Sequence, residues 1–122
     1  MDEKVRDALS KGGVIDITTT GRRTGKPHRI EIAFHNFEGK LYISGMPREQ
    51  KRDWLANMEA SPRFVFHLKG DVSADLPAHA RPITDRTERR EILERVMQAW
   101  GRGDIDEMVR NSPLVEVRIS EP

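Results

Sequence analysis

The stretch that decides the fold is residues 18–29, TTTGRRTGKPHR, in which a run of threonines breaks at a glycine. Before the break, residues 14–20 are mostly β-branched and predict a strand. After the proline, Ile30, Ile32 and Phe34 alternate with Arg, Glu and Ala, which predicts a half-buried second strand. The glycines between the two strands therefore predict a tight strand-to-strand turn. Four cations lie on this turn and the start of the second strand: Arg22, Arg23, Lys26 and Arg29.

The rest of the chain adds strands and helices to this pair. We expect helices at 2–11, 48–60, 85–100 and 104–111, and further strands at 41–44, 63–69, 72–83 and 115–119. Asp85 and Glu88 resemble a capping box, and Leu76-Pro77 suggests an edge strand or a bulge. Hairpin-linked strands predict an antiparallel sheet that curls into a barrel with helices outside it. The fold class is thus α+β, mainly β, with about six strands in a single domain over residues 1–122.

Composition excludes several classes of function. The chain has 21 basic and 20 acidic residues, a net charge of +1, and no cysteine. A nucleic-acid-binding protein usually has a clearer basic excess, and the missing cysteines exclude disulfides and thiolate metal sites. Four histidines, His28, His35, His67 and His79, do not have the spacing of metal ligands, so we expect no metal. The charged N-terminus and short apolar runs predict a cytoplasmic protein without an integral membrane segment.

The cationic turn has three possible interpretations. A P-loop is excluded, because the glycine spacing is one residue too short, Pro27 stands where Ser or Thr would hold magnesium, and a strand follows. The turn could bind an anion, since backbone N–H groups in a Gly-rich turn form a concave nest that arginines can surround. Alternatively, the same charges could serve only to keep an exposed hairpin tip solvated.

Three segments resemble the deazaflavin-dependent nitroreductase family. They are residues 18–29, the helical segment KRDWLANMEASP at 51–62, and the strand-to-helix passage ARPITDRTER at 80–89. The closing residues 115–122 resemble the family's last strand, so the resemblance covers nearly the whole chain in matching order. It implies the split β-barrel of FMN-binding proteins, related to pyridoxamine phosphate oxidase. It further implies an oxidoreductase that uses coenzyme F420, a deazaflavin with a phosphate and an oligoglutamate tail.

The resemblance also implies a cofactor site. Anionic tail groups would lie at the turn, and the redox ring would lie along the second strand, the exit of the third strand and the start of the following helix. Ser44 is the best candidate for a contact with the ring, and no catalytic acid is identified. The cofactor-binding residues implied are Arg22, Arg23, Thr24, Lys26, His28, Arg29, Ile30, Ile32, Tyr42, Ile43, Ser44, Trp54 and Asn57.

The chain departs from the family's pattern near the expected ring. Glu31-Ile32, Met46-Pro47 and Lys51-Arg52 replace the usual Pro-Leu, Gly-Gly and His-Pro, and Tyr42 is the only tyrosine. We expect hydride transfer from reduced F420 to a small conjugated, nitro- or quinone-like acceptor. The alternatives are an FMN-binding reductase with the same barrel, and a flavin- or ligand-binding protein without turnover. The expected partner is a small-molecule substrate, and the chain could be a monomer or a homodimer.

Overall fold

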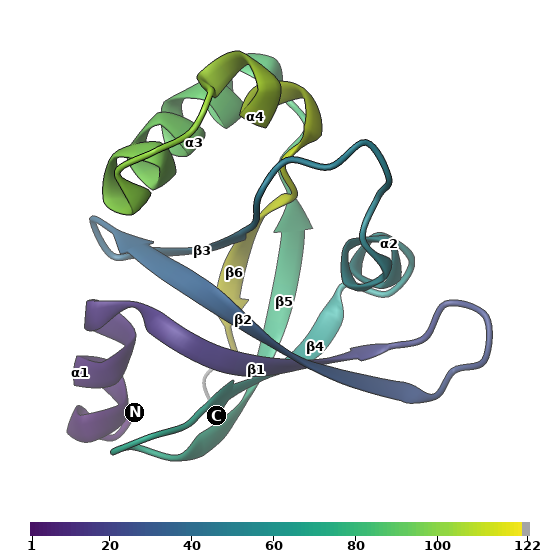
Figure 1. Cartoon of the computed structure of the whole chain (residues 1–122). Helices are drawn as coiled ribbons and strands as arrows, with labels where there is room; N and C mark the ends of the chain where they lie inside the picture. The colour runs from purple at the N-terminus through teal and green to yellow at the C-terminus, as the bar shows by residue number, and fades with distance from the viewer. Residues whose placement is uncertain (121–122) are drawn as a thin grey trace.

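The computed structural model describes residues 1–120 as six strands and four helices (Figure 1). The helices are α1 (Glu3–Lys11), α2 (Asp53–Ala60), α3 (Arg86–Trp100) and α4 (Ile105–Asn111). The strands are β1 (Gly13–Thr20), β2 (Pro27–Phe37), β3 (Lys40–Ser44), β4 (Arg63–Leu68), β5 (Ala74–Pro82) and β6 (Leu114–Ile119). In this described part of the chain, no helix has both the length and the apolar character needed to cross a bilayer.

The six strands close into one antiparallel barrel in the order β1-β2-β3-β6-β5-β4. The two long strands β1 and β2 pair from Gly13–Phe34 to Thr20–Pro27, so their hairpin carries the cationic turn at its end. Figure 1 shows this hairpin projecting beside α2, while α3 and α4 lie together near β3. The mainly β barrel with helices outside it confirms the predicted fold class.

Two hydrophobic clusters stabilise the barrel from its two sides. The first fills the interior with residues that alternate along each strand, among them Ile15, Ile17, Phe34, Ile43 and Phe66. Because strand side chains point alternately to opposite faces, their neighbours in sequence point outward. The second cluster lies between the outer face of β3 and the helices α3 and α4; it includes Tyr42, Ile83, Ile92, Leu93 and Val96.

The helix expected at 48–60 is shorter than predicted, because α2 begins at Asp53. Residue Arg52 at its N-cap is extended, and no side chain caps the first turn. The residues before it, Arg-Glu-Gln-Lys-Arg, contain no apolar side chain that could pack against the barrel. Since a short helix depends on tertiary packing for its stability, helical structure starts only where Trp54 can be buried.

The expected interruption at Leu76-Pro77 is also wrong, because β5 is continuous and has strand neighbours on both sides. Pro77 is opposite Val65 of β4, and its carbonyl accepts a hydrogen bond from Ser120 N at 2.8 Å. The N and O of one strand residue point to the same side, so the missing N–H of Pro77 faces β6. The β5–β6 pairing begins only at Ala78–Ile119, so the proline occupies the end of that ladder.

The start of α3 fits the predicted capping box only in part. Asp85 accepts from Glu88 N at 2.9 Å, as predicted. The Glu88 side chain does not return to the backbone of Asp85 but binds Arg81 at 2.6 Å. At the other end, Gly101 adopts the left-handed conformation that closes the helix, with φ of 72°.

His35 makes the stability of the barrel sensitive to acid. Its ring stacks on Phe37 and lies near Trp100, and its Nε2 atom is buried without a partner among the described residues. Burial lowers the pKa of His35 below its ordinary value. The folded state therefore disfavours the proton. This contribution to stability is complete above the unfolded pKa of about 6.5 and is lost as the pH falls through the lower folded value.

We predict that lowering the pH from about 7.5 to about 5 reduces the free energy of unfolding less in His35→Phe than in the wild type. The phenylalanine keeps the aromatic packing and removes the titration. Urea denaturation at both pH values measures the difference. His79→Gln is the control, since His79 is exposed, and it should keep the wild-type pH dependence. Equal pH dependence in His35→Phe and the wild type would contradict the assignment.

Candidate functional site

A groove of about 740 Å³ lies between the cationic turn, the loop that precedes α2, and α2 itself. Its walls come from two parts of the chain that are distant in sequence: the β1–β2 hairpin, and residues 48–57, which form the loop before α2 and its first turns. The lining residues are Thr19, Gly21, Arg22, Arg23, Thr24, His28, Ile30, Arg48, Gln50, Lys51, Arg52, Asp53, Trp54 and Asn57.

The turn that forms one wall is closed by its own backbone. Gly21 N donates to the carbonyl of Lys26, and Gly25 N donates to the carbonyl of Gly21, both at 2.8 Å. A β-carbon on Gly21 would lie 2.7 Å from Nε2 of His28 and 3.1 Å from the Lys26 carbonyl. Glycine is therefore required there so that the His28 ring can lie against the turn.

The buried amide of Asn57 holds the turn against α2. Its oxygen accepts from Arg22 N at 3.2 Å and from Arg22 Nη1 at 2.9 Å. Its nitrogen donates to the Thr19 hydroxyl at 3.1 Å. Arg22 also pairs with Asp53, with 3.3 Å between Nη2 and Oδ1. Since the charge of Arg22 is already satisfied by α2, its main contribution is to position the turn.

Three other arginines of the groove have no such partners. Arg23, Arg48 and Arg52 make no side-chain hydrogen bond or ion pair with any residue from 1 to 120. The Arg52 guanidinium packs against Gly45, where a β-carbon would lie 3.2 Å from its Cζ and Nη2. Burial, and secondarily the charge of Arg48, lower the pKa of Arg52. A buried arginine whose charge is disfavoured by a neighbouring cation is stabilised when an anion binds beside it.

The groove brings together seven of the residues that the sequence predicted for the cofactor: Arg22, Arg23, Thr24, His28, Ile30, Trp54 and Asn57. The other six lie outside its lining: Lys26, Arg29, Ile32, Tyr42, Ile43 and Ser44. Ile32 packs against the interior cluster, and Ile43 is part of it. Lys26 is part of the turn itself, although it is not among the residues that line the groove.

The strand period explains why Tyr42, Ile43 and Ser44 do not form one site. Ile43 points into the barrel, so its two neighbours point outward. Tyr42 is buried in the second cluster. Ser44 is 3% exposed, and its hydroxyl donates to the carbonyl of Pro113 at 2.8 Å. The proton of the Ser44 hydroxyl is thus donated to Pro113, so this oxygen could contact a ring only as an acceptor.

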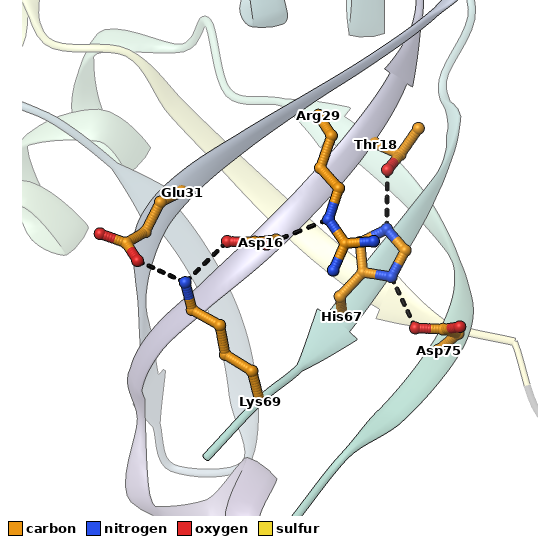
Figure 2. Close-up of polar contacts among 7 residues, drawn as sticks. All are labelled: Asp16, Thr18, Arg29, Glu31, His67, Lys69 and Asp75. Atoms are coloured by element: carbon orange, nitrogen blue, oxygen red, sulfur yellow. Dashed lines mark hydrogen bonds and ion pairs between the residues drawn. The ribbon is translucent and has the colours of Figure 1, made fainter.

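Arg29 lies instead in a charged cluster on the outer face of the barrel (Figure 2). Its Nε donates to Asp16 at 3.0 Å, and Lys69 Nζ binds the other oxygen of Asp16 at 2.8 Å. Lys69 also binds Glu31. The hydrogen bond from Lys69, followed by that from Arg29, lowers the pKa of Asp16. This network therefore neutralises the charge of Arg29. Its side chain lies on the opposite face of β2 from Ile30, which lines the groove.

Figure 2 also shows a hydroxyl, an imidazole and a carboxylate in line. Thr18 Oγ1 lies 2.7 Å from Nε2 of His67, and His67 Nδ1 lies 2.7 Å from Asp75. A hydrolase triad has this order of groups, but it needs a nucleophile on an exposed elbow. Thr18 lies within β1 and pairs with Arg29 and Val65 on its two sides, and the groove does not include it. The triad therefore serves to join three strands.

The sequence interpretation missed the contribution of residues 48–52 to the groove. They were assigned to a helix, yet Arg48, Gln50, Lys51 and Arg52 line the groove from a loop. The loop is held at one end because Arg48 N donates to the carbonyl of Asn111 at 3.2 Å. The sequence does contain an indication that this segment contributes to the groove: the two cations Lys51-Arg52 replace the family's usual residues.

The sequence matches the F420H(2)-dependent quinone reductase family over residues 2–122. The chain belongs to this family. As an F420H(2)-dependent quinone reductase family member, it is an oxidoreductase whose cofactor is coenzyme F420. This finding confirms the family, the enzyme class and the cofactor that the sequence resemblance implied.

Solved structures of proteins with low sequence identity show the same fold as this quinone reductase family member. An F420-H2 dependent reductase is 18% identical, with a TM-score of 0.62, and the match covers 87% of this chain and 94% of that one. A putative 5-nitroimidazole antibiotic resistance protein from Bacteroides thetaiotaomicron is 14% identical, with a TM-score of 0.71 and coverages of 99% and 81%. A putative pyridoxamine 5'-phosphate oxidase from Listeria innocua is 16% identical, with a TM-score of 0.69 and coverages of 98% and 93%.

The donor set of the groove fits the tail of coenzyme F420. Phosphate and carboxylate groups are anions, and arginine forks bind both kinds of group through paired N–H donors. Arg23, Arg48 and Arg52 supply such forks without competing carboxylates of their own among residues 1–120. The apolar side chains of Ile30 and Trp54 line the same groove and can accommodate a flat, less polar group.

We predict that Asn57→Ala lowers the free energy of unfolding by roughly 1–3 kcal/mol, since Thr19 and Arg22 both lose a buried partner. Urea denaturation measures this loss. Hydrogen exchange should also become faster at the amides of the turn, because their tether to α2 is gone. Gln50→Ala is the matched control: Gln50 lines the same groove but is exposed and should cost little. A similar loss in both variants would contradict the role given to Asn57.

Proposed function

We propose that the groove binds coenzyme F420 with its anionic tail at the cationic turn and the adjoining loop. The observation that carries this proposal is a set of three arginines that line one groove: Arg23, Arg48 and Arg52. None of them has an acidic partner among residues 1–120. In this arrangement Arg22 and Asn57 position the turn, and Thr24 and His28 offer further polar contacts. Lys26 would add only long-range attraction, because it lies outside the groove lining.

The less polar part of the cofactor is assigned to the wall formed by Ile30 and Trp54. Trp54 is 8% exposed and packs into the barrel cluster, so its position is fixed before any ligand binds. Ile30 is 36% exposed and therefore offers apolar surface that a ligand can cover. A preformed wall lowers the entropy lost when a flat ring is oriented against it.

The proposed reaction is the reduction of a small conjugated acceptor, with a quinone as the first choice and a nitro compound as the second. Reduced F420 supplies a hydride when bound, and the acceptor takes this hydride together with one proton. The protein orients the two reactants and limits the access of water. We assign no catalytic acid, and a proton from solvent completes the balance. The family to which the chain belongs supports the quinone.

We predict that Arg23→Gln combined with Arg48→Gln weakens F420 binding by roughly tenfold or more, because two charge-assisted contacts are lost. Fluorescence titration of the purified protein with F420 measures the dissociation constant. The difference in F420 affinity between the wild type and the double variant should be larger at low ionic strength, because salt then screens the attraction between the two arginines and the anionic tail less strongly.

Arg63→Gln is the matched control for charge, since Arg63 is exposed on β4 and has no ion pair with any described residue. It should leave F420 affinity unchanged. If the double variant binds F420 as tightly as the wild type at every salt concentration, the tail does not lie at these arginines.

A parallel titration with FMN tests the alternative cofactor. We predict tighter binding of F420, since FMN lacks the oligoglutamate that the additional arginines would contact. The same protein should oxidise reduced F420 when a simple 1,4-naphthoquinone is added, as measured by the recovery of F420 absorbance. Binding of FMN in preference to F420, together with no oxidation of reduced F420, would reject the proposed function.

A further inference from the structure

A second hollow of about 440 Å³ lies on the other side of the loop that precedes α2. Arg48, Gln50, Lys51 and Arg52 line both the groove and this hollow, so the two spaces share a wall. The remaining walls come from α2, the end of β5, the start of α3, and residues 109–114 after and within α4. The volume is in the range of sites that hold small organic molecules.

Cations dominate the lining of this hollow. Six of its residues are Lys or Arg and two are Glu. Lys51 and Glu59 neutralise each other at 2.7 Å, and Glu49 is exposed. The side chains of Arg48, Arg52, Arg86 and Arg110 have no hydrogen bond or ion pair with residues 1–120. The excess of unpaired positive charge favours an anionic ligand.

The sixth cation, Arg89, fixes the wall of the hollow and is not free to bind. Its guanidinium donates to the carbonyls of Ile83 and Val109 at 2.9 Å, and to that of Ser112 at 2.6 Å. Ser112 belongs to the same wall and is 4% exposed. Its hydroxyl is buried and has no partner among the described residues, which is costly unless something binds it. Because this hydroxyl has almost no accessible surface, a ligand in the hollow cannot reach it, and the exposed cations that a ligand can reach include Arg86 and Arg110.

Apolar side chains complete the lining and restrict the kind of anion. Leu55, Ile83, Val109, Pro113 and Leu114 all contribute to the hollow. Inorganic phosphate offers nothing to cover this surface, whereas an aromatic or conjugated carboxylic acid has both a charged end and an apolar body. The mixture of free arginines and apolar walls therefore matches an aromatic carboxylate.

We propose that the second hollow is a binding site for an aromatic carboxylate, held by Arg86 and Arg110. Given the proposed function, on which this extension rests, the hollow holds the carboxylate of an acceptor whose reducible group lies in the cofactor groove. The shared wall of Arg48 and Arg52 places such an acceptor next to the cofactor groove. Lys51-Arg52, where this chain departs from the family's pattern, lies in that wall.

Binding of 1-naphthoate to the purified protein without F420 is the direct test, and it is independent of turnover. Titration calorimetry should detect binding to the wild type that weakens roughly tenfold in Arg110→Gln. Arg102→Gln is the matched control, since Arg102 is exposed and outside the lining. Circular dichroism and a urea titration confirm that each variant is folded.

The kinetic test compares a 1,4-naphthoquinone with the same quinone carrying a short carboxylate chain. In Arg110→Gln, KM for the carboxylated acceptor should rise about tenfold, while the neutral acceptor and F420 affinity should be unaffected. If the wild-type protein does not bind F420, the proposed function is rejected, but the naphthoate titration still tests the second hollow by itself. The site is overturned if naphthoate does not bind the wild type, if Arg110→Gln binds it equally well, or if inorganic phosphate binds and naphthoate does not.

Discussion

Closure of the barrel is the constraint on which the rest of this structure depends. Six strands joined edge to edge leave no unpaired strand, and they enclose an interior that only apolar side chains such as Ile15, Ile17 and Phe66 can fill. Every polar function must therefore be built outside the barrel. The chain uses the projecting end of the β1–β2 hairpin and the loop before α2 for this purpose, and it uses the outer face for structural ion pairs.

A cluster of arginines destabilises the folded state unless other contacts hold it in place. Here the buried amide of Asn57 joins the turn to α2, and Asp53 neutralises Arg22. The turn is therefore held in place by contacts in which Arg23, Arg48 and Arg52 take no part. The unneutralised charges become useful only when an anion arrives. In the same way, Arg89 fixes the wall of the second hollow, while Arg110 has no side-chain partner in the part of the chain that the structure describes. In both hollows, one arginine holds the wall while others remain available to bind.

Much of the fold follows from local sequence patterns. The two-residue period of Ile30, Ile32 and Phe34 and the glycines of the turn predicted the hairpin, and the structure has it in the expected place. The errors occurred where tertiary contacts override local preference. Residues 48–52 remain a loop because they have nothing apolar to bury, and Pro77 fits a central strand because its missing N–H faces the end of β6. Neither condition is visible in a single sequence.

The sequence by itself determined the family, the barrel, and the anionic chemistry expected at the turn, because these depend on residue types and short spacings. Only the tertiary structure decided which charges are available. Arg22, Arg23 and Arg29 lie within eight residues of one another. The first is bound to Asn57 and Asp53, the second lines the groove without a side-chain partner among residues 1–120, and the third pairs with Asp16 outside the barrel. Arg22 and Arg23 line the same groove and differ because long-range contacts with α2 bind only Arg22, whereas the strand period places Arg29 on another surface.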